Sequence, residues 1–399
     1  MQIGFARSAI VLGLLAVVGP FAIDLYLPAI PEIVQDLNTD DAGAHLTFTV
    51  YFLAFGLAQL IYGPLADWLG RKAPVFMGLA VFIAGSVLCA TAQDIAMLTT
   101  GRFVQALGAA STMVIARAVV RDMHTGTEAT RLMALVMLVI SISPLLAPLT
   151  GSVIISFASW RMIFYALGLI AVAALAVTVF LLPETLPRES RSRIDLTGLV
   201  RSTIYLIRDA KFVGLTLIAG FSLASFFVFI ASAPMVYMTQ YQLSPTGFSL
   251  VFAIGAVGFF GASQFAARLG QRYGMARVAF WAVCGFAAAT NLLFGLVFAG
   301  IDQLPVLIAL LFIGNAFLGL VIAPTMVMAL EAHGEHAGMA SSLGGTLQMV
   351  SGGVMILVCS PFFDRTALPL TGAIASCSLL ALVFALLTIR PASPEKAPA

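Results

Sequence analysis

Charged side chains are scarce in this sequence. Only 10% of the 399 residues are Asp, Glu, Lys or Arg, whereas 61% are hydrophobic and the mean hydropathy is +1.04. Soluble domains typically contain about 25% charged and about 45–50% apolar residues. A soluble chain of this size could not cover its surface with so few polar groups, so we expect an integral membrane protein. The net charge is only +2 and no basic stripe alternates with aromatics, so we expect no nucleic-acid partner.

Cysteine and histidine are also rare, with four residues of each type. The four cysteines all fall inside apolar runs: Cys89, Cys284, Cys359 and Cys377. Their spacing favours buried hydrophobes over disulfides, a redox pair or metal ligands. The segment "EAHGEHAG" (331–338) places His333 and His336 beside two glutamates, but it fits no zinc signature. We therefore expect no metal and no cofactor apart from a coupling proton. Since no nucleophile–His–acid set and no phosphate-binding loop is present, we do not expect an enzyme.

Long apolar runs, by contrast, fill the chain. Twelve of them are bounded by charges, and each is near the ~20 residues needed to cross a bilayer. They lie at 8–31, 45–66, 73–92, 95–120, 132–157, 162–182, 212–238, 247–267, 278–299, 304–330, 338–363 and 367–389. The first run imitates a signal peptide, but we expect it to be retained as the first span. Continuous rather than alternating runs predict an all-α membrane protein with twelve transmembrane helices.

Basic residues predict the orientation of these helices. If the N-terminus is cytoplasmic, seventeen of the twenty basic residues lie in inside segments. They are Arg7, Arg71, Lys72, Arg117, Arg121, Arg131, Arg188, Arg191, Arg193, Arg201, Arg208, Lys211, Arg268, Arg272, Arg277, Arg390 and Lys396. The outer edges keep only Arg161 and Arg365, and Arg102 lies within a span. The positive-inside rule then places both termini in the cytoplasm.

The longest inside connection divides the chain into two halves. We predict a six-helix half at 1–182, a cytoplasmic linker at 183–211, a second six-helix half at 212–390 and a cytoplasmic tail at 391–399. The linker sequence "IDLTGLVRSTIYLIRD" spaces apolar residues helically among basic ones, so we expect it to lie along the cytoplasmic membrane surface.

An internal repeat agrees with this division. "GPLADWLGRK" (63–72) joins the second and third spans, and "ARLGQRYGMA" (267–276) joins the eighth and ninth. Gly274 follows Gly70 by 204 positions. Two equivalent halves around a site at the midplane are typical of secondary transporters.

Several motifs point to a known family. "GPLADWLGRK" resembles the loop signature of the major facilitator superfamily, and "GRFVQALGAAS" (101–111) resembles its fourth-span motif. "DLYLPAIP" (24–31), "ISPLLAPLTG" (142–151) and "AGMASSLGGT" (337–346) resemble the bicyclomycin-resistance (Bcr/CflA) branch of bacterial drug exporters. The resemblance implies the major facilitator fold, in which two pseudo-symmetric six-helix halves form a proton-driven exporter in the bacterial inner membrane. We expect it to act as a monomer.

Asp24 is the candidate coupling residue, because it is the one acid inside the first-half spans. It lies eight positions before Glu32, and Arg102 lies eight positions after Asp94, so at 1.5 Å rise per residue both sit ~12 Å below the outer boundary. This matched depth predicts that the two charges compensate each other. As a coupling group, Asp24 would change its proton affinity with the distance of Arg102 and of water. The alternative is a permanent ion pair that only locks two helices.

Other residues are candidates for the cavity, the gate and a bend. We expect the adaptable substrate cavity to be lined by Tyr51, Phe55, Gln105, Phe226 and Phe227, although simple packing is the alternative for each aromatic. The expected cytoplasmic gate comprises Gly63, Asp67, Gly70, Arg71 and Lys72. By the family pattern, Asp67 faces the start of the eleventh span at Gly338 and Ser341; the alternative is a merely solvated loop.

A proline- and glycine-containing stretch in the fifth span completes the set. Pro144, Pro148 and Gly151 predict a gating bend, with passive close packing as the alternative. In the superfamily's exporters the matching stretch usually ends Gly-Pro-x-x-Gly-Gly, whereas this chain has Ala147 before Pro148. Together these features predict proton-coupled export of small drugs by alternating access. A proton-coupled symporter, or an exporter of a metabolite, remains the alternative with the same fold.

Overall fold

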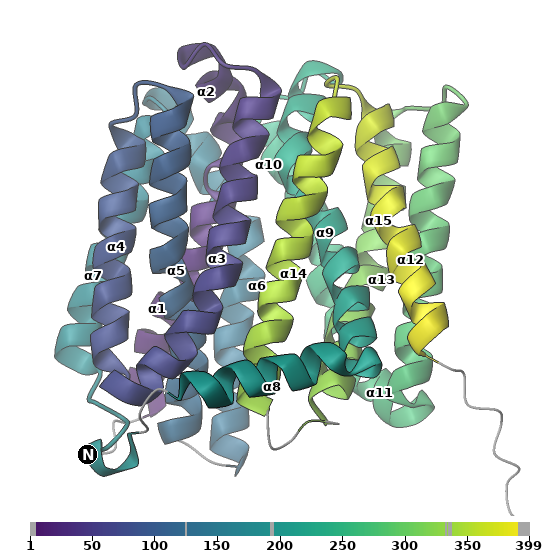
Figure 1. Cartoon of the computed structure of the whole chain (residues 1–399). Helices are drawn as coiled ribbons and strands as arrows, with labels where there is room; N and C mark the ends of the chain where they lie inside the picture. The colour runs from purple at the N-terminus through teal and green to yellow at the C-terminus, as the bar shows by residue number, and fades with distance from the viewer. Residues whose placement is uncertain (1–4, 124–125, 192–194, 332, 334–336, 390–399) are drawn as a thin grey trace, which may run out of the picture.

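The computed structural model of this chain is a bundle of helices that run roughly parallel to one another (Figure 1). It describes residues 5–123, 126–191, 195–331, 333 and 337–389. These residues contain no strand, and twelve helices are long and apolar enough to cross a membrane. The predicted all-α fold with twelve spans is confirmed. The predicted tail at 391–399 and His336 lie outside the described residues.

Each half contributes six spans. Those of the first half are α1 (Phe5–Asp24), α3 (Asp41–Leu69), α4 (Lys72–Ala90), α5 (Ile95–Met123), α6 (Gly126–Phe157) and α7 (Arg161–Leu181). Those of the second half are α9 (Ala210–Thr239), α10 (Pro245–Ser263) continued by α11 (Ala266–Tyr273), α12 (Met275–Phe298), α13 (Leu304–Glu331), α14 (Ala337–Cys359) and α15 (Ala367–Thr388).

The same packing pattern recurs in both halves. The pairs α4–α5, α3–α5, α4–α7 and α1–α6 of the first half correspond to α12–α13, α10–α13, α12–α15 and α9–α14 of the second. The repeated loop agrees: Gly70 has φ +90° and Gly274 has φ +85°, a backbone conformation that residues with a Cβ rarely adopt. The internal repeat of the sequence is therefore a repeat of structure.

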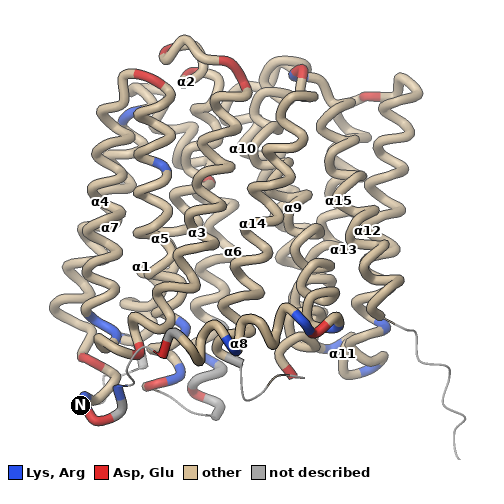
Figure 2. Tube along the Cα trace, viewed as in Figure 1, with Lys and Arg blue, Asp and Glu red and all other residues tan. Residues whose placement is uncertain are grey.

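Short helices distinguish the two ends of the bundle. The α2 end carries α2 (Ile30–Asp36) and the 3₁₀ helices η1 (Leu27–Ala29) and η4 (Ser360–Phe362), whereas the α8 end carries the amphipathic helix α8 (Leu196–Arg208). Blue segments, which mark Lys and Arg, gather mainly at the α8 end (Figure 2). This charge asymmetry is the one that the sequence predicts for the cytoplasmic side.

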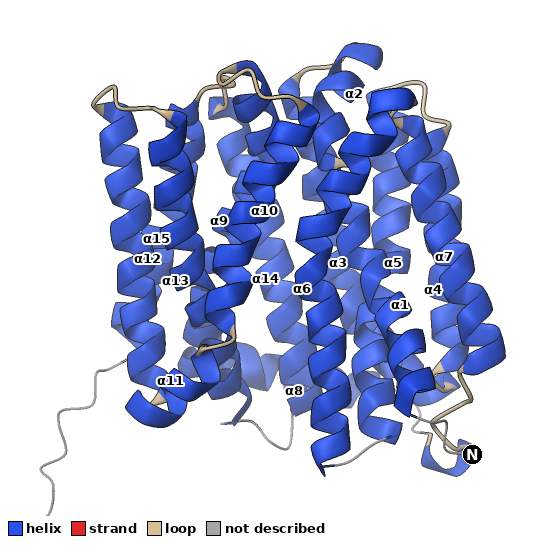
Figure 3. Cartoon of the chain, turned by 180° about the vertical axis from the view of Figure 1, so that it is seen from behind, coloured by secondary structure: helices blue, strands red, loops and turns tan. Residues whose placement is uncertain are grey.

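Two seams join the halves. The helices α3 and α14 pack along one seam, and α6 and α10 pack along the other, which is seen from behind in Figure 3. At the α2 end, η1 also packs against α9 and α10, and η4 packs against α3. No comparable packing joins α5 to α13 within the described ranges. The short helices η1 and η4 therefore add contacts between the halves at the α2 end.

Ion pairs and hydrogen bonds reinforce the closure of the α2 end. Arg365, between η4 and α15, donates two hydrogen bonds to the carboxylate of Asp41 in α3, at 2.7 and 2.8 Å. His45 Nδ1 lies 2.9 Å from the Ser360 hydroxyl. Both contacts cross from one half to the other, so they stabilise a conformation that is closed at this end.

Candidate functional site

The first span breaks at the candidate coupling residue. The helix α1 ends at Asp24, and the chain continues through η1 into α2. Pro28 and Pro31 contribute to this change of direction, because proline lacks an N–H donor and restricts the residue before it. The estimate of depth from Glu32 assumed a continuous helix, and that assumption is wrong here.

Arg102 of α5 lies against this helix end. Its side chain is fully buried, and Nη1 donates to the carbonyl oxygen of Ala22 at 2.7 Å and to Oε1 of Gln105 at 2.6 Å. The last carbonyl groups of an α-helix lack partners within the helix, and they form the negative end of its dipole. Arg102 therefore caps the end of α1 with both a hydrogen bond and a positive charge.

Two aromatic rings and a short polar chain hold the guanidinium in place. Its central carbon lies 4.1 Å from the centre of the Tyr51 ring and 4.9 Å from that of Tyr26, distances typical of cation–π contacts. Gln105, which accepts from Arg102, donates through Nε2 to the Ser86 hydroxyl at 2.9 Å. The two remaining donor atoms of Arg102, Nε and Nη2, are buried without a hydrogen-bond partner in the described part of the chain.

Asp24 is close to this cluster but not paired with it. The residue is 4% exposed, and its carboxylate makes no ion pair or hydrogen bond with any described residue. The predicted charge compensation with Arg102 is therefore not formed in this conformation, because the guanidinium is bound to the Ala22 carbonyl, Gln105 and the two rings. The predicted common depth does hold, since Arg102 contacts residues on both sides of Asp24.

The fifth span passes close to the break. A Cβ at Gly151 would clash with the carbonyl oxygen of Leu25, the residue after Asp24. On the seam with the second half, the Ser249 hydroxyl of α10 donates to the Pro148 carbonyl at 2.9 Å. The helix α6 runs unbroken through both of its prolines, from Gly126 to Phe157. These contacts favour close packing, the alternative that the sequence left open for Gly151.

The predicted cavity residues fall into two groups. Tyr51, Phe55 and Gln105 belong to the Arg102 cluster, with the Tyr51 and Phe55 rings stacked at 6.1 Å between centres. Phe227 of α9 stacks across the boundary between the halves on Phe52 of α3, with 4.1 Å between the ring centres. Phe226 packs instead on rings of α10. The four rings and the amide thus belong to both halves, and Phe227 is the one that contacts the opposite half in these ring pairs.

A crevice occurs elsewhere, between α3 and α14 at the α2 end. Its lining residues are Ala42, Gly43, His45, Leu46, Thr49, Leu357, Ser360 and Pro361. None of the predicted cavity residues lines it.

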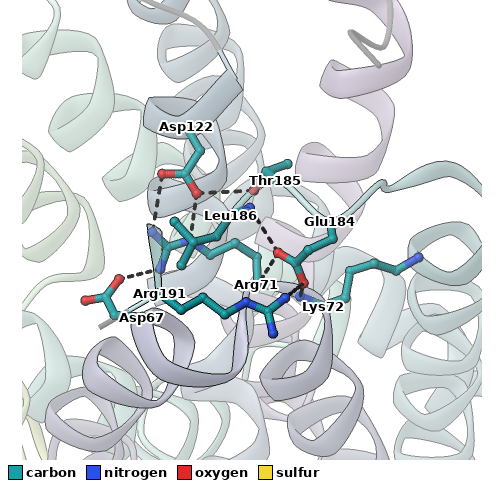
Figure 4. A network of polar contacts seen from close by, with 8 residues as sticks. All are labelled: Asp67, Arg71, Lys72, Asp122, Glu184, Thr185, Leu186 and Arg191. Carbon is teal, nitrogen blue, oxygen red and sulfur yellow. Dashed lines mark hydrogen bonds and ion pairs between the residues drawn. The ribbon is translucent and has the colours of Figure 1, made fainter. Parts of the chain in front are cut away.

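A second polar cluster is centred on Arg71 at the α8 end (Figure 4). The side chain of Arg71 is 5% exposed and binds two carboxylates. It donates to both oxygens of Asp122, through Nε at 2.6 Å and Nη2 at 3.3 Å, and through Nη1 to Asp67 at 2.6 Å. Asp122 is the better sheltered partner, because its side chain is 14% exposed whereas that of Asp67 is 52% exposed.

The linker closes this cluster from outside the bundle. Glu184 accepts from the backbone N–H groups of Arg71 at 2.8 Å and Lys72 at 3.2 Å, at the start of α4. Negative charge is favourable at a helix N-terminus. Arg191 lies 3.6 Å from the same carboxylate. A side chain at Gly70 would meet Glu184, so the glycine serves both the turn and this contact.

The predicted contact of Asp67 with the eleventh span is absent in this conformation. Asp67 binds Arg71 and makes no hydrogen bond to Gly338 or Ser341 among the described residues. The expected membership of Gly70, Arg71 and Lys72 in one cluster fits the structure, whereas Gly63 faces open space. The sequence missed Asp122 and Glu184; the signal was their position as acids directly after predicted spans on an otherwise basic side.

A third polar cluster joins the linker to the second half. Asp209, between α8 and α9, accepts from the backbone N–H groups of Phe212 and Lys211 and lies 3.0 Å from Nε2 of His333. The hydrogen bond from Phe212, followed by those from Lys211 and His333, holds the pKa of Asp209 below its usual range. This cluster was not predicted, because nothing in the sequence brings His333 to Asp209.

Comparison with known proteins agrees with this architecture. The family model of the Major Facilitator Superfamily matches residues 12–356. An uncharacterized MFS-type transporter, YdgK, of Bacillus subtilis is 33% identical over 92% of this chain and 91% of its own. A "Bicyclomycin resistance protein homolog" of Haemophilus influenzae is 28% identical over 93% of each chain.

A solved structure shows the same fold. The crystal structure of a D-xylose–proton symporter has a TM-score of 0.75 at 15% identity and covers 96% of this chain and 97% of its own. With a family match over most of its length and twelve apolar helices in two equivalent halves, this chain belongs to the Major Facilitator Superfamily and is a multi-pass membrane protein.

Proposed function

We propose that this protein is a proton-coupled exporter of small drugs in the bacterial inner membrane, acting as a monomer with the α8 end and both termini in the cytoplasm. The observation that carries the coupling is the buried carboxylate of Asp24, unpaired at the end of α1, the same helix end whose Ala22 carbonyl binds Arg102 while two donor atoms of that arginine stay unused. The relative named for bicyclomycin resistance supports drugs as the substrate class.

The chemistry follows from what each group needs. A buried carboxylate without a partner is costly to ionise, and the negative end of a helix dipole adds to that cost. This conformation therefore suits the protonated acid. Nε and Nη2 of Arg102 are available to a carboxylate. When α1 and α5 shift so that the guanidinium reaches Asp24, the ionised form is favoured and the proton leaves.

Alternating access converts this exchange into transport. A proton enters at the α2 end when that end opens, and it is carried into the present conformation, closed at the α2 end, on protonated Asp24. The shift that brings Arg102 to Asp24 then releases the proton toward the α8 end and leaves the site ready to accept drug. Tyr51, Phe55 and Gln105 from the first half and Phe226 and Phe227 from the second would line the drug site between the halves.

The Arg71 cluster supports a gate at the α8 end. Asp67 is half exposed and already oriented by Arg71, and it lies at the end of α3, the helix that packs against α14. When the α8 end closes, the N–H groups at the start of α14, near Gly338 and Ser341, would offer Asp67 a second partner.

Proteoliposomes test the coupling. Asp24→Asn removes the titratable group but keeps its shape, so drug-linked proton movement should be abolished while the protein still folds. Asp94→Asn is the matched control: it removes one charge from the same half, and asparagine preserves the helix cap on Met97. Arg102→Ala should be worse for folding, because it leaves the end of α1 uncapped. Drug-linked proton movement by well-folded Asp24→Asn would contradict the proposal.

The direction of transport needs a separate measurement, because the fold alone does not set it. A susceptibility panel in a strain without its own drug pumps identifies substrates. An exporter lowers the amount of substrate inside the cell, whereas a symporter with the same fold raises it.

A further inference from the structure

The linker helix α8 presents three different faces along its 13 residues. Its bundle-facing side contains Leu199, Ser202, Thr203 and Leu206, which are half-buried or buried. Leu206 is fully buried in one hydrophobic cluster with Phe212 of α9, and the Thr203 hydroxyl lies 3.7 Å from Met339 Sδ of α14. These contacts fix α8 to the second half.

The adjacent face is apolar but uncovered. At 3.6 residues per turn, Val200, Ile204 and Ile207 fall about 100° around the helix from the bundle-facing side. They are 57%, 46% and 54% exposed. A third face, a further quarter turn around, carries the exposed Arg201 and Arg208. An apolar stripe beside a basic stripe is typical of helices that lie in a membrane interface.

The position of α8 indicates what covers its exposed apolar and basic faces. The helix runs across the bundle at the level where the spans end, roughly at right angles to them (Figure 1). This is the height of the lipid headgroups when the spans cross a bilayer. We infer that α8 docks on the cytoplasmic leaflet and binds anionic phospholipid. Val200, Ile204 and Ile207 enter the acyl boundary, and Arg201 and Arg208 bind lipid phosphates.

Arginine suits the headgroup role. Its guanidinium binds phosphate oxygens through two parallel hydrogen bonds, and its charge is attracted to an anionic leaflet. Near such a surface each basic residue contributes about 1 kcal/mol, which corresponds to roughly a fivefold change in the docking equilibrium.

Docking has a mechanical consequence. Because α8 packs on α9 and α14, and Asp209 caps α9 directly after it, docking anchors the second half to the leaflet. Among the described residues, α8 packs on no helix of the first half to a comparable extent, so the first half is then the half that moves. The charge of the cytoplasmic leaflet therefore changes how firmly the second half is anchored, and it does not act on the first half in this way.

Hydrogen exchange of the full chain tests the docking. The protein is placed in single-copy nanodiscs of phosphatidylcholine, with or without about one third phosphatidylglycerol. Peptides covering 196–208 should exchange several-fold more slowly with the anionic lipid, and added salt should reverse the difference. The double variant Arg201→Gln, Arg208→Gln should lose this lipid dependence, because both charges that bind lipid phosphates are removed. Ile204→Asn should raise exchange in both lipids.

A charge-matched control separates α8 from general electrostatics. Arg268→Gln with Arg272→Gln removes the same charge from α11, at the same end of the bundle, and should leave exchange in 196–208 unchanged. Three outcomes would each overturn the inference: an equal effect of the control, exchange in 196–208 that does not depend on lipid charge, and protection that needs two copies per disc.

Discussion

Removing either carboxylate from Arg71 should have very different consequences for stability. Asp122 binds Arg71 through two nitrogens, and the two side chains are 14% and 5% exposed. Breaking a buried pair by removing one partner costs about 3–5 kcal/mol. Because Arg71 retains Asp67, we expect Asp122→Ala to cost about 3 kcal/mol. Asp67 is 52% exposed, so Asp67→Ala should cost less than about 1 kcal/mol, as surface pairs do.

Thermal unfolding of the purified protein in detergent measures this difference. One kcal/mol shifts the melting temperature by about 2–4 °C for a unit the size of one half, so Asp122→Ala should lower it by about 6–12 °C and Asp67→Ala by less than about 4 °C. Scan rate is held constant, because unfolding of such proteins is often irreversible. Asp195→Ala, which removes an exposed acid at the same end, is the control. Equal losses for Asp67→Ala and Asp122→Ala would refute the assignment of Asp122 as the main partner.

Three further outcomes are expected. Arg365→Gln removes the ion pair with Asp41 that joins the halves at the α2 end. Spin-label distances between α3 and η4 should then show that the population open at the α2 end has increased by up to about fivefold. A reporter enzyme that works only in the cytoplasm should be active when fused to the C-terminus, and one that works only outside should be active when placed between α12 and α13. The opposite result would reverse the proposed orientation. Asp209→Ala should cost about 1 kcal/mol at neutral pH. Because the hydrogen bond from Phe212 holds the pKa of Asp209 below its usual range, the cost should persist above about pH 4 and disappear as the pH falls through that lowered value.

The break in α1 marks the limit of what local sequence patterns predict about the Arg102 cluster. The sequence singles out Asp24 as a candidate, because an acid in an apolar run is conspicuous without any knowledge of its neighbours. It also placed Arg102 at the right level. It did not give the partner of Arg102, since the Ala22 carbonyl is a backbone group that becomes available only where α1 ends. Any pattern based on side-chain charge would choose Asp24 instead.

The Arg71 cluster shows the same division. The loop motif identified Asp67 and Arg71, which lie four positions apart on either side of the turn between α3 and α4. Asp122 lies 51 positions from Arg71 and Glu184 lies 113 positions away. These contacts depend on the packing of α4 against α5 and on the path of the linker, and no local signal specifies either.

The sequence by itself determined the number of spans, the charge asymmetry of the two ends and the twofold repeat. The first two depend on transfer of single residues between water and lipid, which is nearly additive along the chain, and the repeat is visible as similarity between two loop sequences. Only the tertiary structure decided which end of the bundle is closed, which donors of Arg102 stay unused and which side of α8 is left uncovered. Those properties depend on groups far apart in the chain that compete for a few partners in a medium where an unmade hydrogen bond is costly.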